Sequence, residues 1–306
     1  MRARLAAISA ALLLSASAAQ ADGPSVVVSI KPLHSLVAGV TQGVSEPELL
    51  LAAGDSPHTY TMRPSEARAV RGADLIVRVS PHMETFLNQA LAAHSGTRSV
   101  LTAAQLDGVE VLGPRQDRSQ GEGADHDAHP GAHRRDYHLW LDPDNARAIT
   151  TAVAERLAAL DPAHADTYRD NAEAQRARIE ALDERLRRRL EPVQDEPYVV
   201  FHDAYRYFER HYGLEAAGAV TPNPNQPPGA GHLQGLRERI RELGAVCVFS
   251  EPQFDPAIVR SLTNGLDARS GQLDPLGTGL EAGPDAYFEL LEGLADGFRA
   301  CLLEAD

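Results

Sequence analysis

The sequence predicts an α/β protein made of two Rossmann-like lobes, each with a parallel sheet, joined by a single long helix. Short apolar runs alternate with helical periodicity, which is typical of a parallel sheet covered by helices on both faces. The same rhythm returns in the second half of the chain without a detectable sequence repeat. Between the halves lies a helical stretch of about 27 residues, which would be about 40 Å long.

In the first half, the predicted strands are apolar runs, as expected when a sheet is buried on both faces. We expect strands over 26–30, 48–52 and 74–80. We expect helices over 33–40, 65–71, 83–94 and 145–160. The apolar run at 137–141 also predicts a strand.

The linking helix is predicted over 164–190, a stretch rich in Ala, Arg, Glu and Leu. A helix of this length is a stiff connector that limits hinge motion between two halves. In the second half we expect strands over 198–201, 216–220 and 245–249. We expect helices over 204–212, 232–243, 256–266 and 285–302.

The first residues have the features of a secretory signal peptide. Arg2 and Arg4 precede an apolar stretch, and Ala19-Gln20-Ala21 forms an A-x-A cleavage signal before Asp22. A transmembrane anchor is the weaker alternative, because the apolar core is shorter than the about 20 residues that a bilayer requires. We therefore expect export to the periplasm and no membrane insertion of the mature chain.

The expected division of the chain follows from these elements. It comprises a signal peptide over 1–21, an N-terminal lobe over 22–162 with a loop over 113–136, a linking helix over 163–192 and a C-terminal lobe over 193–306.

The formal net charge is −14 and becomes −16 without residues 1–21, which contain two arginines and no acid. This balance argues against nucleic acid and anionic membranes as partners and mildly favours cations. We expect a monomer.

Three separated histidines suggest a metal site. His58 lies in a turn, His138 opens the apolar run at 137–141, and His202 ends the strand expected at 198–201. Neutral imidazole is the commonest protein ligand for borderline divalent metals, and three imidazoles with one oxygen complete a tetrahedral zinc site. Separations of 80 and 64 residues mean that only the tertiary fold could assemble such a site. The alternatives are a surface histidine at position 58 and a buried core histidine at position 138.

The fourth ligand is predicted to be Asp274, in the segment QLDPLG. Water could take the same position, and structural capping of a turn is a competing role for this aspartate. Glu251, after the strand at 245–249, is a weaker candidate. The other histidines outside the polar loop, among them His211, lack comparable context and are expected to be surface or packing residues.

Residues 113–136 form a polar loop without apolar periodicity, and it contains His126, His129 and His133. Two interpretations remain open: an accessory, weaker metal site, or a plain solvated loop.

The chain has two cysteines, Cys247 and Cys301. In an exported protein such a pair most often forms a disulfide, which here would tie the strand at 245–249 to the C-terminal helix. Metal ligation by these thiols is the lesser alternative, because no C-x-x-C spacing or adjacent histidine supports it.

Several segments resemble the ZnuA family, the periplasmic zinc-binding components of zinc ABC importers. They are IKPLHSLVAGV, SPHTYTMRPSEARAVRGADLIVRVSPHMETFL, HLWLDPDNAR, YVVFHDAYRYFERHYGL, VCVFSEPQF and LDPLG. The resemblance covers essentially the mature chain. It implies a cluster A-I fold with metal held between the lobes, and delivery to an ABC permease in the inner membrane.

The resemblance also implies roles for individual residues. It carries zinc ligation onto His58, His138 and His202, and places Asp274 where related manganese and zinc binders have a carboxylate ligand. It matches Cys247 and Cys301 to the disulfide of the zinc branch. There are two departures: the loop has only three histidines, and Pro57 stands where some members have an acidic residue beside the first ligand.

The preferred function is therefore a periplasmic Zn²⁺ receptor rather than an enzyme. Three imidazoles favour zinc, whereas a manganese site would use more carboxylate oxygen. A hydrolytic zinc enzyme competes, because three ligands and an open water position also describe catalytic zinc. The chain has no H-E-x-x-H or nucleophile elbow. A metal-dependent adhesin would be favoured by a lipobox cysteine near the cleavage signal, and none occurs.

Overall fold

The computed structural model describes residues 23–51, 54–92, 99–113, 115, 135–221, 229–254 and 256–303. The predicted signal peptide and the three loop histidines lie outside these residues. Within them the chain forms two four-stranded sheets, and all strand pairs are parallel. Helices cover both sheets, so the α/β prediction is confirmed.

The first sheet has the strand order β2-β1-β3-β4. Its strands are β1 (Val26–Val28), β2 (Glu48–Leu49), β3 (Leu75–Arg78) and β4 (Ser99–Thr102). The helices of this half are α1 (Lys31–Thr41), α2 (Pro64–Gly72), α3 (Thr85–Ala92) and α4 (Pro143–Leu160). The sequence did not predict β4, because its four residues begin and end with hydroxyl side chains and show too short an apolar run.

The second sheet repeats this topology with the order β6-β5-β7-β8. Its strands are β5 (Tyr198–His202), β6 (Ala216–Thr221), β7 (Cys247–Ser250) and β8 (Arg269–Gln272). Its helices are α6 (Arg206–Tyr212), α7 (Ala230–Leu243), α8 (Ala257–Thr263) and α9 (Ala286–Leu302). The edge strand β8 was also missed, because its residues are Arg, Ser, Gly and Gln and carry no apolar pattern.

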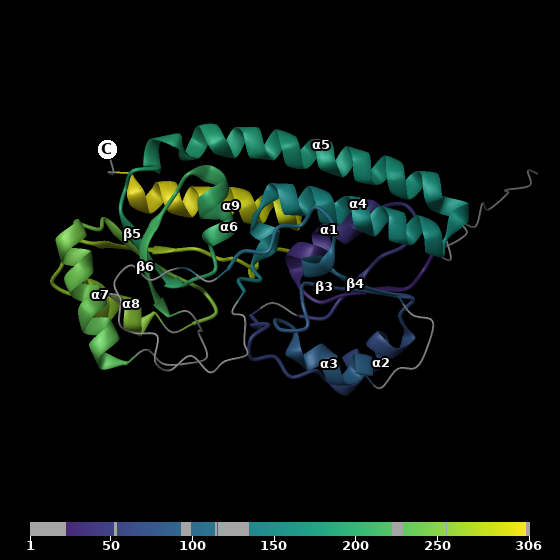
Figure 1. The fold of residues 1–306 in the computed structure, drawn as a ribbon, viewed down its shortest axis with the longest axis horizontal. Coiled ribbons are helices and arrows are strands. Elements are labelled where there is room, and N and C mark those ends of the chain that lie inside the picture. The colour runs from purple at the N-terminus through teal and green to yellow at the C-terminus, as the bar shows by residue number, and fades with distance from the viewer. Residues whose placement is uncertain are drawn as a thin grey trace, which may run out of the picture.

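A single long helix, α5 (Ala165–Leu190), connects the two halves and has 26 residues. Figure 1 shows it running above both sheets, with α1, α4 and α9 beneath it. Short 3₁₀ turns at Pro162–His164 and Glu191–Val193 precede and follow it. The predicted linking helix is therefore confirmed.

One hydrophobic core runs through both halves. Alternate strand residues such as Val28 and Val200 face this core, which α1, α4, α5 and α9 cover. The intervening residues face outward: Val27 packs beneath α2 and α3, and Val199 packs beneath α7 and α8. Because the inner core is continuous, opening the molecule between its halves would expose apolar surface.

The strand predicted at 137–141 is wrong. Leu139–Leu141 form a 3₁₀ turn that leads into α4, where Pro143 begins the helix and Asp142 caps it. The side chains of Leu139, Trp140 and Leu141 are fully buried. The indole of Trp140 donates a hydrogen bond to the carbonyl oxygen of Pro275 at 2.8 Å. The apolar run thus fills the space between the halves and pairs with no strand.

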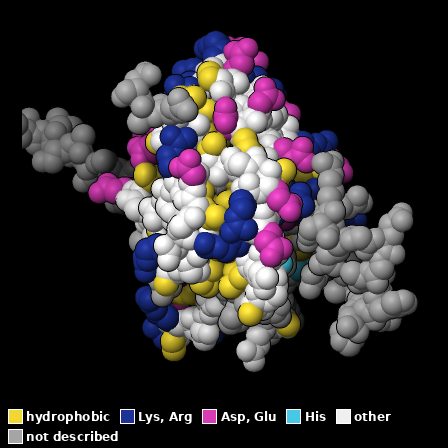
Figure 2. Space-filling model, turned by 90° about the vertical axis from the view of Figure 1, so that its left-hand side faces the viewer, with side chains coloured by type: hydrophobic (Ala, Val, Ile, Leu, Met, Phe, Trp, Pro, Cys, Tyr) yellow, Lys and Arg dark blue, Asp and Glu magenta, His cyan; other side chains and the backbone are white. Residues whose placement is uncertain are grey.

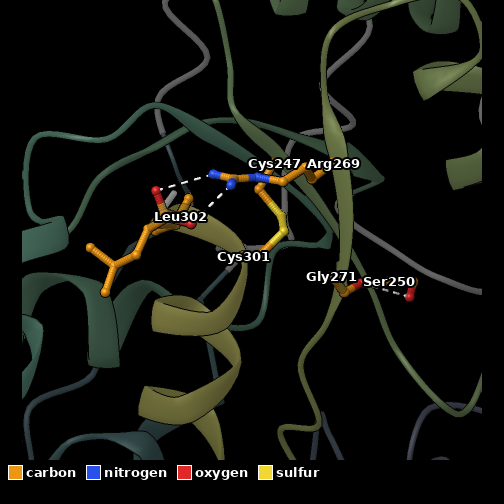
Figure 3. Close-up of a disulfide and its surroundings, with 7 residues drawn as sticks. Cys247, Ser250, Arg269, Gly271, Cys301 and Leu302 are labelled. Carbon is orange, nitrogen blue, oxygen red and sulfur yellow. Dashed lines mark hydrogen bonds between the residues drawn. A yellow bond between two sulfur atoms is a disulfide. The ribbon is translucent and has the colours of Figure 1, made fainter. Parts of the chain in front are cut away.

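Cys247 and Cys301 form a disulfide with a Cα–Cα separation of 6.0 Å, so the predicted pairing is confirmed. Figure 3 shows that it joins β7 to the end of α9, and that Arg269 on the neighbouring strand donates to the carbonyl oxygen of Leu302. A Cβ on Gly271 would lie 2.6 Å from the ring of Phe249, so only glycine fits there.

No described helix is both long and apolar enough to cross a membrane. The face in Figure 2, at the α5 C-terminal end of the molecule, carries intermixed acidic, basic and apolar side chains. The net negative charge is therefore not gathered into one patch on this face.

Candidate metal centre

The fold brings the three predicted histidines together. His58 comes from the loop between β2 and α2, His138 precedes the 3₁₀ turn at Leu139–Leu141, and His202 ends β5. One ring nitrogen of each lies within 4.8 Å of the others. The ring centroids are 5.6 Å apart for His58 and His138, 5.2 Å for His58 and His202, and 4.8 Å for His138 and His202. Two of the rings thus come from the first half and one from the second.

These rings are shielded from solvent. His138 and His202 are buried and His58 is partly buried. Burial, reinforced by the neighbouring imidazoles of His138 and His202, lowers the pKa of His58 to about 2. The His58 ring is therefore neutral at physiological pH, which is the protonation state in which an imidazole ligates a cation.

Carboxylates lie next to the second ring nitrogen of two of these histidines. Asp136 Oδ1 is 2.8 Å from His138 Nδ1 and also accepts the His138 backbone N–H at 3.0 Å. Glu251 Oε1 lies 3.4 Å from His202 Nδ1 and accepts the hydroxyl of Tyr205 at 3.1 Å. If Nδ1 carries the proton, Nε2 keeps its lone pair for a metal, which is the usual arrangement of carboxylate, histidine and metal.

The sequence did not reveal the role of Asp136. One local signal could have indicated it: Asp136 lies two residues before His138, and an aspartate side chain readily accepts the backbone N–H two residues further along the chain. The sequence did single out Glu251, but as a ligand candidate rather than as a partner of His202.

Asp274 does not join the three histidines. Its carboxylate instead accepts the backbone N–H groups of Leu276 and Gly277 at 3.0 and 3.1 Å, and the side-chain amide of Gln253 at 2.8 Å. The backbone N–H of Thr278 also donates to it. In this arrangement Asp274 closes a turn, which is the competing role expected from the sequence.

The histidines line a small cavity with both polar and apolar side chains in its wall. Its wall consists of Ser56, Pro57, His58, His138, Trp140, His202, Glu251, Gln253, Phe254, Pro275 and Leu276. The enclosed space is about 10 Å³, which is close to what one water molecule or one small ion requires. Three neutral imidazoles around such a space can coordinate a single borderline divalent cation.

The two ends of the polar loop are anchored beside this cavity. Asp136 donates its backbone N–H to the carbonyl oxygen of Leu112 at 3.0 Å. The hydroxyl of Tyr207 donates to the carbonyl oxygen of Asp136 at 2.7 Å and accepts the N–H of Leu112 at 2.8 Å. These hydrogen bonds place both ends of the loop near His138. The chain between them, which contains His126, His129 and His133, lies largely outside the described residues.

Comparison with known proteins agrees with this architecture. The model of the ZnuA family, described as the periplasmic component A of a zinc-uptake complex, matches residues 26–301. The "High-affinity zinc uptake system protein ZnuA" of Brucella abortus (strain 2308) is 38% identical over 310 residues, covering 90% of this chain and 91% of the relative. The protein of the same name from Yersinia pestis is 36% identical over 308 residues, covering 97% and 96%.

A crystal structure of ZnuA aligns with this chain at a TM-score of 0.78 and 25% identity, covering 92% of this chain and all of that one. The family model and the named relatives extend over nearly the whole sequence, and the range that the family model matches spans positions 58, 138 and 202. The chain therefore belongs to the ZnuA family, the periplasmic components of zinc-uptake complexes.

Proposed function

We propose that this protein is a periplasmic receptor that binds one Zn²⁺ between its two halves and delivers it to an ABC permease in the inner membrane. The observation that carries the proposal is the convergence of His58, His138 and His202 around a cavity of ion size. Relatives named as high-affinity zinc uptake proteins support zinc as the cargo.

For the fourth ligand, the hydrogen bonds of the turn support water over Asp274. To reach the ion, the Asp274 carboxylate would have to give up the backbone N–H groups of Leu276 and Gly277. An Asp274→Asn variant tests this choice, because asparagine keeps one acceptor for the turn. Unchanged zinc affinity supports water, and a loss of about tenfold or more supports the Asp274 oxygen as the ligand.

The division into lobes at 22–162 and 193–306 with a linking helix at 163–192 is part of this proposal. The continuous core beneath α5 supports capture by small adjustments around the cavity rather than by wide hinge opening. Export through a cleaved signal peptide over 1–21 places the receptor in the periplasm, and the family supports this location. Nothing in the proposal requires a second copy of the chain.

The polar loop is proposed as a weaker accessory site, because it contains three histidines and its described ends, Leu112 and Asp136, lie near His138. Deleting 121–135 should lower the number of zinc ions bound and leave the tight site intact. Equal stoichiometry in the deletion variant would assign His126, His129 and His133 to a plain solvated loop.

A hydrolytic role is disfavoured by the size of the cavity. A space of about 10 Å³ beside three histidines leaves no room for an ester or peptide substrate next to a bound metal. Substrate turnover by the zinc-loaded protein that chelation abolishes would contradict this conclusion.

The main experiment is native mass spectrometry of the full chain with competing divalent ions, because it reports metal identity and number together. We expect zinc to outcompete manganese.

A His202→Asp variant should lose zinc affinity and shift its preference toward harder ions, since oxygen donors suit manganese better. His82→Ala is a matched control, because His82 stacks on Tyr137 and is not part of the group of three. Unchanged zinc affinity in His202→Asp would sink the proposed site.

A further inference from the structure

A second group of nitrogen and oxygen donors lies apart from the three-histidine group. Within the described part of the chain, ligand atoms of Asp142, Asp144 and His211 fall within 4.8 Å of one another. His211 Nδ1 is 3.2 Å from Asp142 Oδ1 and 4.0 Å from Asp144 Oδ2. Ligand atoms of a tetrahedral zinc site, with bonds of about 2.0–2.1 Å, lie about 3.3 Å apart. One pair already has this spacing, and a small movement of Asp144 would supply the third atom.

These three residues come from both halves of the molecule. Asp142 caps α4 and accepts the backbone N–H of Asp144 at 2.8 Å, while His211 lies in the last turn of α6. Asp144 pairs with Arg147 through Oδ1, which leaves Oδ2 facing His211. The side chain of His211 is 6% exposed and that of Asp144 is 60% exposed, so the group is closed on one side and open to solvent on the other.

The other ring nitrogen of His211 has its own carboxylate. Nε2 lies 2.8 Å from Oδ1 of Asp183 on α5. An outer carboxylate of this kind orients a metal-ligating histidine and raises its basicity. Arg187 lies on the same side, with its guanidinium nitrogen 2.7 Å from Nε2 and 3.2 Å from Asp183 Oδ2. The positive charge of Arg187 is therefore next to Nε2, while the two α4 aspartates lie next to Nδ1.

An independent observation comes from Tyr287 on α9. Its side chain is fully buried, and its hydroxyl has no hydrogen-bond partner among the described residues. The carboxylates of Asp142 and Asp183 lie close enough to this hydroxyl to act on it electrostatically. A buried hydroxyl without a partner is costly, and a hydrated cation beside it would supply one.

We propose that Asp142, Asp144 and His211 form a second divalent-cation site, with one nitrogen donor, two carboxylate donors and water completing the coordination. Such a donor set accepts zinc and also harder ions. Because α4 belongs to the first half and α6 to the second, an ion bound here ties the two halves together. Its exposed side and its mixed donors make it weaker than the three-histidine site.

The test is calorimetric titration of the full chain with zinc sulfate, and with manganese chloride in a second arm. Asp144→Asn and Asp142→Asn remove one ligand charge each, and asparagine preserves the cap of α4 because it caps helices as well as aspartate. Asp296→Asn is the matched control, since Asp296 is 63% exposed, against 60% for Asp144, and also pairs with an arginine. We expect both α4 variants to lose one bound zinc per chain and the control to lose none.

Two outcomes overturn the proposal. The first is equal zinc stoichiometry in Asp144→Asn, Asp142→Asn and the unmodified chain. The second is an unchanged ring ¹⁵N signal of His211 in excess zinc, which would identify a protonated histidine bridging two carboxylates. A His58→Ala variant keeps the two sites distinguishable, because it should lose the tight zinc and retain this one.

Discussion

The ammonium group of Lys31 donates a hydrogen bond of 2.6 Å to the backbone carbonyl oxygen of Gly277, which lies in the other half of the molecule. Lys31 is the one lysine in the sequence, and it also donates to the carbonyl oxygens of Thr278 and Leu280. Burial lowers the pKa of the Lys31 ammonium, and the negative charge of Asp274 counteracts this shift. Lys31 thereby holds the turn whose preceding residues line the metal cavity.

Replacing Lys31 with methionine should destabilise the protein by about 3 kcal/mol, because one buried and two partly buried carbonyl oxygens lose their donor. Zinc should also dissociate about tenfold faster, because the turn beside the cavity loses the hydrogen bonds of Lys31. A tenfold change corresponds to about 1.4 kcal/mol. Urea unfolding and stopped-flow chelation measure the two effects. Arg176→Met, on the exposed face of α5, is the control and should change neither. An unchanged dissociation rate in Lys31→Met would show that the turn is held by its other contacts.

Asp136→Asn should weaken zinc binding by about 10–100-fold, the usual effect of losing a carboxylate behind a metal-ligating histidine. The amide no longer stabilises the charge that His138 gains on ligating a cation. Competition with a fluorescent chelator measures the affinity. Asp107→Asn is the matched control, since Asp107 is exposed on the surface. Equal affinities of the two variants would contradict the orienting role of Asp136.

Glu84 predicts a pH dependence of stability. Burial raises the pKa of its carboxyl, although the hydroxyl of Ser29 and the backbone N–H groups of Ser80 and Val79 donate to it. Above pH 4.5 the folded chain therefore retains a proton that the unfolded chain releases, and stability falls as the pH rises toward the raised pKa. The slope for one such group is at most about 1.4 kcal/mol per pH unit.

The Glu84→Gln variant should lose this slope while being less stable at low pH, because its amide cannot accept all three donors. Denaturant unfolding at a series of pH values compares the two proteins. Parallel stability curves for the variant and the unmodified chain would show that Glu84 does not titrate in this way.

Removing the disulfide by replacing Cys247 and Cys301 with alanine should cost about 3–4 kcal/mol, as expected for closing a loop of this length. The sequence separation of the two cysteines is 54 residues. Zinc affinity should be unchanged, because Cys247 pairs with Tyr198 at the start of the strands, whereas His202 lies at their end. Urea unfolding of the oxidised protein and zinc titration check the two statements, and a large loss of zinc affinity would count against the second.

Some features of this fold follow from local sequence patterns. Long periodic segments predicted α5 and α9, and continuous apolar runs predicted β1, β3 and β5, because side-chain spacing reports secondary structure directly. Strands β4 and β8 were missed, since the apolar run of β4 is only two residues long and β8 has no apolar residue. The apolar run at 137–141 misled the prediction, because burial in a 3₁₀ turn and burial in a strand require similar residues.

The candidate site divides in the same way. His58 and His202 were recognisable because a turn and a strand end are where α/β proteins place ligands. The role of Asp136 behind His138, the turn closed by Asp274 and the meeting of His211 with Asp142 were not recognisable. Each of these depends on which direction a side chain takes after the chain has packed.

By itself the sequence determined the α/β class, the long helix, the cysteine pair and the three histidines, because each is a pattern of residue types along the chain. The tertiary structure alone decided which groups lie within hydrogen-bonding or coordination distance of one another. Examples are the carboxylates beside the histidines and the N–H groups that donate to the Asp274 carboxylate. The physical reason is that contacts between residues far apart in sequence depend on how the two sheets pack against α5, and that packing is a property of the whole core.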